Sequence, residues 1–203
     1  LVASHDVRND PRYLSMYTVM GFGWVSLWVA TLRLSGLQIA DVTERRNPGA
    51  LLMYLGAVIG FACAFAGANV GDGPGWWVVT FAAVLSSLAL WVVIISEHFI
   101  VRVDHRVLVD RDVGVALRLA AVMIAAGVVG GRAVAGTWVS FEATLTDFLE
   151  VSWTLLPLIV LDAMVTIVTR MGVSRTPLVL DGLLALLYLG AAIGFVIWLG
   201  MPP

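Results

Sequence analysis

Residues 47–68 read NPGALLMYLGAVIGFACAFAGA, an uncharged run that opens on an asparagine and a proline. A run of this length and polarity is typical of a helix that crosses the hydrocarbon core of a bilayer. Asn47 stands where an N-cap is expected, because its short side-chain oxygen can accept hydrogen bonds from the first backbone N–H groups of a helix. The stretch therefore predicts a transmembrane helix near residues 50–68, capped by Asn47.

Five further apolar runs are separated by short polar connections. Of the 203 residues, 60% are hydrophobic and 13% are charged, whereas soluble domains are about half apolar and about a quarter charged. Apolar surface in such excess has to face lipid. The sequence therefore predicts one all-α integral membrane domain over residues 1–203, with six transmembrane helices near 13–34, 50–68, 76–101, 113–134, 151–169 and 179–199.

The arginines indicate which way the helices point, because positive residues collect in cytoplasmic loops. Nine of the twelve lie on the side of the loops that join odd-numbered to even-numbered helices, and three lie on the other side. We therefore expect both termini to be extracytoplasmic. The chain has no lysine, which is typical of a GC-rich genome, and its residue usage suits a bacterial inner membrane. The nine are Arg33, Arg45, Arg46, Arg102, Arg106, Arg111, Arg118, Arg170 and Arg175, and the three are Arg8, Arg12 and Arg132.

Part of the sequence recurs. Residues 54–61 read YLGAVIGF and residues 188–195 read YLGAAIGF, with Asn47 and Asp181 at matching positions upstream and Asp112 as a weaker middle copy. This pattern predicts three parallel two-helix repeats whose even-numbered helices are capped by these three residues. Glycines four residues apart recur in the same helices and predict close helix packing. The pairs are Gly56 with Gly60, Gly127 with Gly131, and Gly190 with Gly194.

The segment of Asn47, small residues and GAVIG resembles the YjfL-like family of bacterial inner-membrane proteins, the domain of unknown function 350. The resemblance covers residues 41–136. It implies tandem two-helix units with an asparagine at the helix start. Members of the family usually have four helices, so this chain carries an extra pair. The family has no established activity, so the resemblance implies none.

Asp162 lies near the middle of the fifth predicted span, in WTLLPLIVLDAMVTIV. A carboxylate at the centre of a membrane helix costs roughly 2.5–3.5 kcal/mol to insert, so it should face the interior of the bundle, pair with a hydrogen-bond donor or be protonated. Two interpretations are open: an ion or proton site, and a structural hydrogen bond to another helix or subunit. We expect no arginine of this chain at the depth of Asp162.

Three more polar residues lie near the cytoplasmic ends of the predicted spans. Glu97 and His98 end the third span, and they are interpreted either as a proton relay or as groups that reach the interface. Arg118 lies about two turns into the fourth span. We expect it to extend back to the lipid headgroups or to meet Glu97.

The sequence predicts neither a cofactor nor a metal site. The absence of lysine excludes a retinal Schiff base, and the single Cys63 excludes a thiolate cluster within one chain. The histidines are too few and too poorly placed for a bis-histidine haem. The arginines are dispersed and form no basic patch, so we expect no binding of nucleic acid. The chain has no P-loop, GxSxG or HExxH motif, so we do not expect an enzyme. The three histidines are His5, His98 and His105.

Two functions remain. The first interpretation is a structural or accessory subunit of a larger membrane assembly, in contact with the lipid bilayer and with other membrane subunits or further copies of itself. The alternative is an ion or small-solute channel or transporter that uses Asp162. With one mid-membrane charge in the sequence, a channel would have to be oligomeric.

Overall fold

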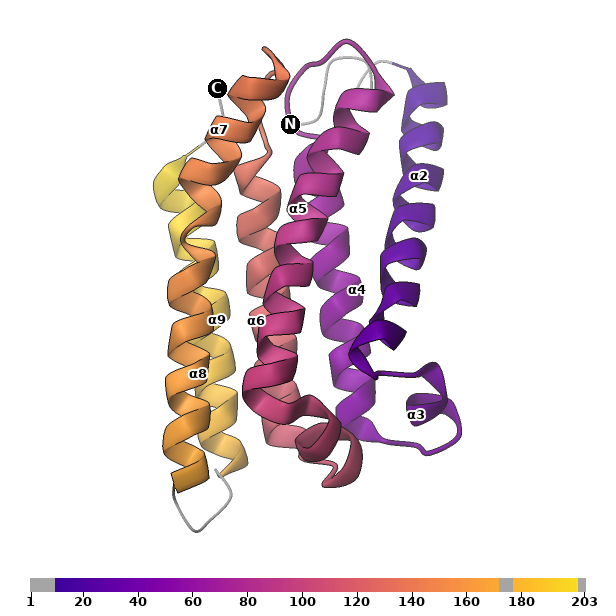
Figure 1. Cartoon of the computed structure of the whole chain (residues 1–203). Helices are drawn as coiled ribbons and strands as arrows, with labels where there is room; N and C mark the ends of the chain where they lie inside the picture. The colour runs from indigo at the N-terminus through magenta and orange to yellow at the C-terminus, as the bar shows by residue number, and fades with distance from the viewer. Residues whose placement is uncertain (1–9, 172–176, 201–203) are drawn as a thin grey trace.

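The computed structural model describes residues 10–171 and 177–200, and the regular elements formed by these residues are all helices. Six helical stretches are long and apolar enough to cross a membrane, as the sequence predicts. The chain is therefore an all-α integral membrane protein. Figure 1 shows these helices lying side by side in one bundle.

Most spans begin and end within a few residues of their predicted positions. The elements in chain order are α2 (Pro11–Ala30) with the 3₁₀ turn η1 (Thr31–Ser35), α3 (Ile39–Thr43), α4 (Pro48–Ala68), α5 (Trp76–Glu97) with the π-helical segments η2 (His98–Arg102) and η3 (Asp104–Val109), α6 (Val113–Ala133), α7 (Phe141–Ser152), α8 (Leu155–Met171) and α9 (Leu178–Leu199).

The fifth span is longer than the sequence predicts. Its helix starts at Phe141, ten residues before the predicted start at residue 151, and α7 leads into α8 through a turn at residues 153–154. Hydropathy missed α7 because it carries Glu142, Asp147 and Glu150. The side chain of Ser140 caps α7 by accepting a hydrogen bond from the backbone of Ala143. The extension moves the middle of this span away from Asp162, which lies halfway between the middle and the end at Thr169.

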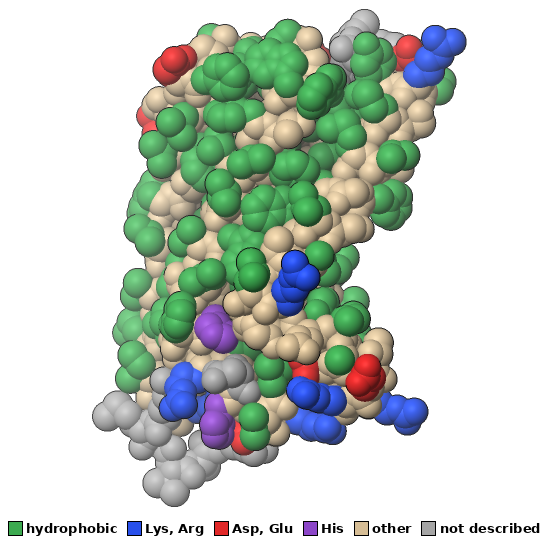
Figure 2. All heavy atoms as spheres, turned by 45° about the vertical axis from the view of Figure 1, so that its right-hand side comes forward, with side chains coloured by type: hydrophobic (Ala, Val, Ile, Leu, Met, Phe, Trp, Pro, Cys, Tyr) green, Lys and Arg blue, Asp and Glu red, His purple; other side chains and the backbone are tan. Residues whose placement is uncertain are grey.

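The two ends of the bundle differ in charge. α3, η2 and η3 lie together at one end, which we call the arginine-rich end. Figure 2 shows arginine and histidine side chains gathered there, while hydrophobic side chains cover most of the remaining face. Such a band of exposed apolar side chains is what a bilayer would contact. The arginines of this end include Arg45, Arg46, Arg102, Arg106 and Arg111.

α6 is the central helix of the bundle, with α4 and α9 on its two sides and α5 against both α4 and α6. Most of its side chains are buried. α4 and α6 both begin at the arginine-rich end and run in parallel. A parallel contact between them is possible because α5 returns the chain across the membrane.

The contact between α4 and α6 depends on glycine. A Cβ atom added to Gly56 would lie 2.6 Å from Ala120 Cα, and one added to Gly60 would lie 2.7 Å from the backbone oxygen of Met123. On α6, a Cβ atom added to Gly127 would collide with the backbone of Gly60, and one added to Gly131 with that of Cys63. Backbones therefore touch along this seam, which leaves no room for a side chain.

The third glycine pair behaves differently. Gly190 and Gly194 on α9 have open space where a Cβ atom would stand. The sequence predicts that these two glycines pack closely against another helix, but neither does so within the described residues. The reason is that α9 meets α6 through the opposite face, which carries Asp181, Ala185, Tyr188 and Ala192.

α2 is attached to the bundle mainly by tryptophan. Trp28 stacks on Phe61 with ring centroids 5.6 Å apart, and Trp24 lies 6.1 Å from Phe65. The indole nitrogen of Trp24 also donates a hydrogen bond of 3.0 Å to Ser87 on α5. These aromatic contacts join α2 to both α4 and α5, although α2 itself has no fully buried residue.

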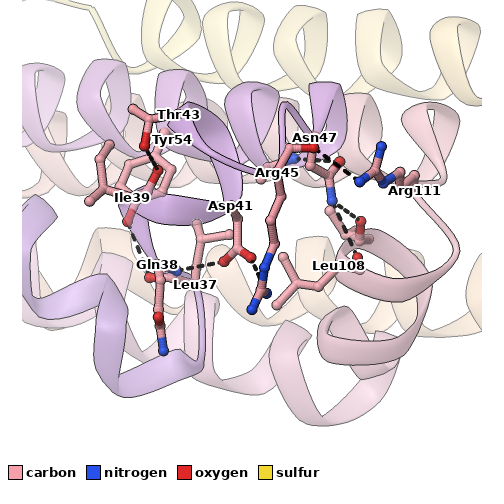
Figure 3. Close-up of polar contacts among 12 residues, drawn as sticks. Leu37, Gln38, Ile39, Asp41, Thr43, Arg45, Asn47, Tyr54, Leu108 and Arg111 are labelled. Carbon is pink, nitrogen blue, oxygen red and sulfur yellow. Dashed lines mark hydrogen bonds and ion pairs between the residues drawn. The ribbon is translucent and has the colours of Figure 1, made fainter.

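Asn47 and Asp112 cap α4 and α6. The Asn47 side-chain oxygen accepts hydrogen bonds from the backbone of Gly49 and Ala50, and its amide donates to the carbonyl of Val107 at 2.9 Å. Figure 3 shows Asn47 holding the start of α4 against the π-helical segment that precedes α6. The Asp112 side chain accepts from the backbone of Val115.

The loops before these two caps share a backbone pattern at an offset of 65 residues. Asn47 and Asp112 each donate a backbone hydrogen bond to a carbonyl six residues earlier, and the preceding residues Arg46 and Arg111 both have a left-handed φ, of 48° and 53°. Asp181 does not follow this pattern, because Pro177 is the cap of α9 and Asp181 lies inside the helix. The threefold repeat stays a prediction.

Candidate functional site

Arg118 extends from α6 into the core of the bundle and is only 1% exposed. Its Nε lies 3.1 Å from Asp162 Oδ1 on α8 and 3.8 Å from Asp181 Oδ1 on α9. Its Nη2 donates a hydrogen bond of 2.9 Å to the hydroxyl of Thr166. The side chain therefore joins three helices through its charged group.

This arrangement corrects two expectations. Arg118 does not reach the headgroups, because α6 is enclosed by α4, α5 and α9 and offers its side chain no path to the interface. The chain also does supply a cation at the depth of Asp162. Asp162 lies seven residues before the end of its span at Thr169, and Arg118 lies five residues after the start of its span at Val113, so the two residues are close in depth.

Asp162 is completely buried and faces away from lipid. Besides Arg118, it is contacted by two hydroxyl groups: Tyr188 on α9 donates to Oδ1 at 3.1 Å, and Thr166, one turn further along α8, lies 3.5 Å from Oδ2. The cost of burying this carboxylate is therefore partly offset by one ion pair and by hydroxyl donors.

Asp181, predicted as a helix cap, belongs to this cluster instead. It is completely buried in the first turn of α9, and its carboxylate lies against Gly114 at the start of α6. A Cβ atom on Gly114 would stand 2.5 Å from Asp181 Oδ2, so the glycine makes room for the carboxylate. Asp181 misses the cap position because α9 begins at Leu178, directly after Pro177.

Glu97, the last residue of α5, supplies a third buried carboxyl group and is 3% exposed. Asp162 and Arg118 are the charged groups that act on it. No described residue donates a geometrically sound hydrogen bond to either of its oxygens. His98 follows it at the start of η2, with its Nδ1 buried and lacking a partner among the described residues.

The structure thus brings together three of the four predicted intramembrane residues, Glu97, Arg118 and Asp162, with His98 next to them in the chain. Three further groups join them that the sequence does not predict at this site. These are Asp181, Tyr188 and Thr166. The sequence held one signal for Thr166, since its i+4 spacing from Asp162 puts both on the same face of a helix. No sequence pattern pointed to Tyr188 as a partner of Asp162, because Tyr188 was interpreted only as part of the repeated segment YLGAAIGF.

The cluster has an excess of acid. One guanidinium group faces three carboxyl groups, all of them buried. If all three were ionised, the site would carry a net charge of −2 in a medium of low dielectric, where like charges on neighbouring carboxylates cannot persist. Arg118 can balance one of them. The site can therefore bind positive charge, as protons or as a small cation.

An apolar groove approaches the cluster from the side facing away from the arginine-rich end. It runs between α6, α8 and α9, and its lining includes Val129, Pro157, Leu158, Tyr188 and Phe195. Tyr188 stands at the junction, because its ring lines the groove while its hydroxyl group binds Asp162.

Comparisons with protein-family models, with curated proteins and with solved structures give no match to this chain. The fold and the site define an all-α integral membrane protein with a charged cluster buried among four of its spans. The resemblance to the YjfL-like family stays a prediction.

Proposed function

We propose that this protein is a membrane transporter or channel that moves protons or small cations, and that the cluster around Arg118 is its ion site. The observation that supports the proposal is the three buried carboxyl groups around a single guanidinium. Ionisable residues inside a membrane are rare, and they commonly mark ion pathways and proton relays.

A purely structural role accounts for less of the geometry. One arginine and one aspartate are enough to tie α6 to α8, and a buried ion pair adds little net stability over a well-packed apolar pair. The additional acids, Glu97 and Asp181, raise the cost of the core unless they take up positive charge. A site that binds and releases cations accounts for the presence of both acids.

Flux through reconstituted liposomes tests the proposal. Purified protein should conduct protons or a monovalent cation down an imposed gradient, and Asp162→Asn should abolish this flux while the protein stays folded. Asn keeps the size and some hydrogen bonding of Asp but cannot titrate. Asp110→Asn is the matched control, because Asp110 is a half-buried acid at the arginine-rich end, outside the cluster.

The result against the proposal is a folded protein that gives no flux of protons, sodium or potassium. Equal flux through the parent protein and Asp162→Asn would place the ion path elsewhere. Thermal unfolding in detergent, measured on the same preparations, shows whether a loss of flux reflects a loss of fold.

A second function, as a subunit of an oligomeric membrane assembly, is favoured by α9. Its segment YLGAAIGF is nearly identical to YLGAVIGF of α4, whose glycines touch α6, yet Gly190 and Gly194 have open space beside them. Leu183, Leu187 and Ile197 lie on the same exposed stripe. Mass measurement in detergent tests this role, since Gly190→Leu should reduce the oligomer to a smaller species.

We further propose that the protein lies in a bacterial inner membrane, with the arginine-rich end cytoplasmic and both termini outside. With Arg118 buried in the core, eight arginines support this orientation and three oppose it. Single cysteines in a Cys63→Ser background provide the test. A cysteine at Arg45 should react only from the cytoplasmic side and one at Gly73 only from outside, and the reverse result would invert the topology.

A further inference from the structure

We propose that the ion bound by the cluster is the proton, and that Glu97 is the residue that takes it up and shares it with Asp162. This inference rests on the proposed transport function and narrows it in two respects. It names the ion, and it assigns the uptake step to a residue on α5 that is separate from the Arg118–Asp162 ion pair.

The geometry disfavours a metal cation at this site. Arg118 already occupies the space between the aspartates, 3.1 Å from Asp162 and 3.8 Å from Asp181, and its positive charge repels a second cation. Calcium requires six to eight oxygen ligands, and magnesium a near-ideal octahedron. The described residues contain no group of three or more acids, histidines or cysteines arranged to hold a metal ion. A proton needs only one oxygen.

Glu97 is the carboxyl group best placed to hold that proton. It is 3% exposed, and among the described residues neither of its oxygens has a hydrogen-bond donor. Asp162, in contrast, has Arg118 and the Tyr188 hydroxyl. Two carboxyl groups that face each other in a dry site share a proton, because a hydrogen bond between them forms only when one is protonated.

The charged and titratable groups around Glu97 come from four elements. They are His98 on η2, Arg118 on α6, Asp162 on α8 and Tyr188 on α9, while Asp181 on α9 contacts Arg118. Arg118 and Asp162 are the two of these groups that carry opposite charges toward Glu97. Proton transfer is balanced within the pair: the O–H bond on Glu97 breaks as an O–H bond on Asp162 forms, and Glu97 is left ionised.

The position of Glu97 indicates the side of uptake. It is the last residue of α5, directly before the π-helical segments that form the arginine-rich end. π-Helical turns inside helices are often found at functional sites. His98 is half-buried and adjacent, so it can pass a proton between that end and Glu97. On the opposite side, Tyr188 and the apolar groove separate the cluster from the far end.

The test compares three variants in liposomes that contain a pH-sensitive dye. Glu97→Gln should reduce proton flux to the level of protein-free liposomes, and Glu97→Asp should restore part of it, because only Asp can carry a proton. Glu44→Gln should behave like the parent, since Glu44 is an exposed acid at the arginine-rich end. Sodium and potassium flux are measured on the same vesicles.

Each outcome decides a separate point. Proton flux that persists in Glu97→Gln but not in Asp162→Asn overturns the role of Glu97 and leaves the transport function intact. Sodium or potassium flux without proton flux overturns the choice of ion only. The absence of any flux overturns the proposed function as well.

Infrared spectroscopy of the parent protein decides the matter even if Glu97→Gln fails to fold. The parent should show a buried protonated-carboxyl band at neutral pH that shifts in heavy water, and Glu97→Asp should displace this band. A parent spectrum with no protonated-carboxyl band overturns the inference.

Discussion

The two sides of α6 are held in different ways. Toward α4, glycines bring two backbones into contact. Toward α8 and α9, a single arginine meets buried acids and hydroxyl groups. The first side is specified by shape and the second by charge. A shape-based seam therefore tolerates no added volume, whereas a charge-based contact tolerates changes that keep its charges balanced.

The largest expected effect is on the shape-based side. Gly127→Leu should prevent folding, because even a Cβ atom at this position would collide with the backbone of Gly60. Recovery of monodisperse protein from detergent measures this. Gly23→Leu is the control, since Gly23 on α2 has open space at that position. Normal folding of Gly127→Leu would mean that α4 and α6 do not touch.

The next effect is on the charge-based side. Arg118→Met should lower the free energy of unfolding by about 3–5 kcal/mol, because it leaves buried carboxyl groups without their cation. Chemical or thermal unfolding in detergent measures the change. Arg132→Met is the control, because the Arg132 side chain donates a hydrogen bond to an exposed carbonyl, that of Gly200. A double variant with Arg118→Met and Asp162→Leu should recover part of the loss, which would show that charge balance, and not arginine itself, stabilises this side.

A smaller effect is expected where the shape-based seam begins. Asn47→Ala should destabilise the protein by about 1–2 kcal/mol, since it removes the cap of α4 and a bond to Val107. Asp112→Ala should cost less, because Asp112 makes one cap bond and a looser ion pair with Arg106 at 3.8 Å. Equal losses in the two variants would contradict this order.

The smallest effect on stability is expected on α9. Gly194→Leu should change the free energy of unfolding of the single chain by less than about 0.5 kcal/mol, because the added side chain meets no described atom. It should still lower the mass of any oligomer that forms through this face. A strong loss of monomer stability would mean that α9 is packed against its own chain.

More of the fold than of the site could be predicted from the sequence. Apolar runs located six spans because bilayer thickness sets their length. The cost of exposing a carboxylate to lipid was enough to predict that Asp162 faces the interior of the bundle. The sequence did not reveal Arg118 as its partner, since hydropathy does not show which face of α6 a side chain occupies, and Arg118 points into the core and not toward the headgroups. Asp181 was wrongly predicted as the cap of α9, because the helix begins at Leu178, directly after Pro177, one turn before the predicted cap.

The order of residues along the chain also bears on biosynthesis. Arg118 precedes Asp162 by 44 residues and Asp181 by 63 in the chain, and an arginine inside a helix costs roughly 2.5–3.5 kcal/mol to insert. Glu97 lies on the span immediately before it and is present from the start. The hairpin of α5 and α6 therefore contains both an acid and the arginine before α8 and α9 are made. The aspartates of α8 and α9 then join a charge that is already accommodated.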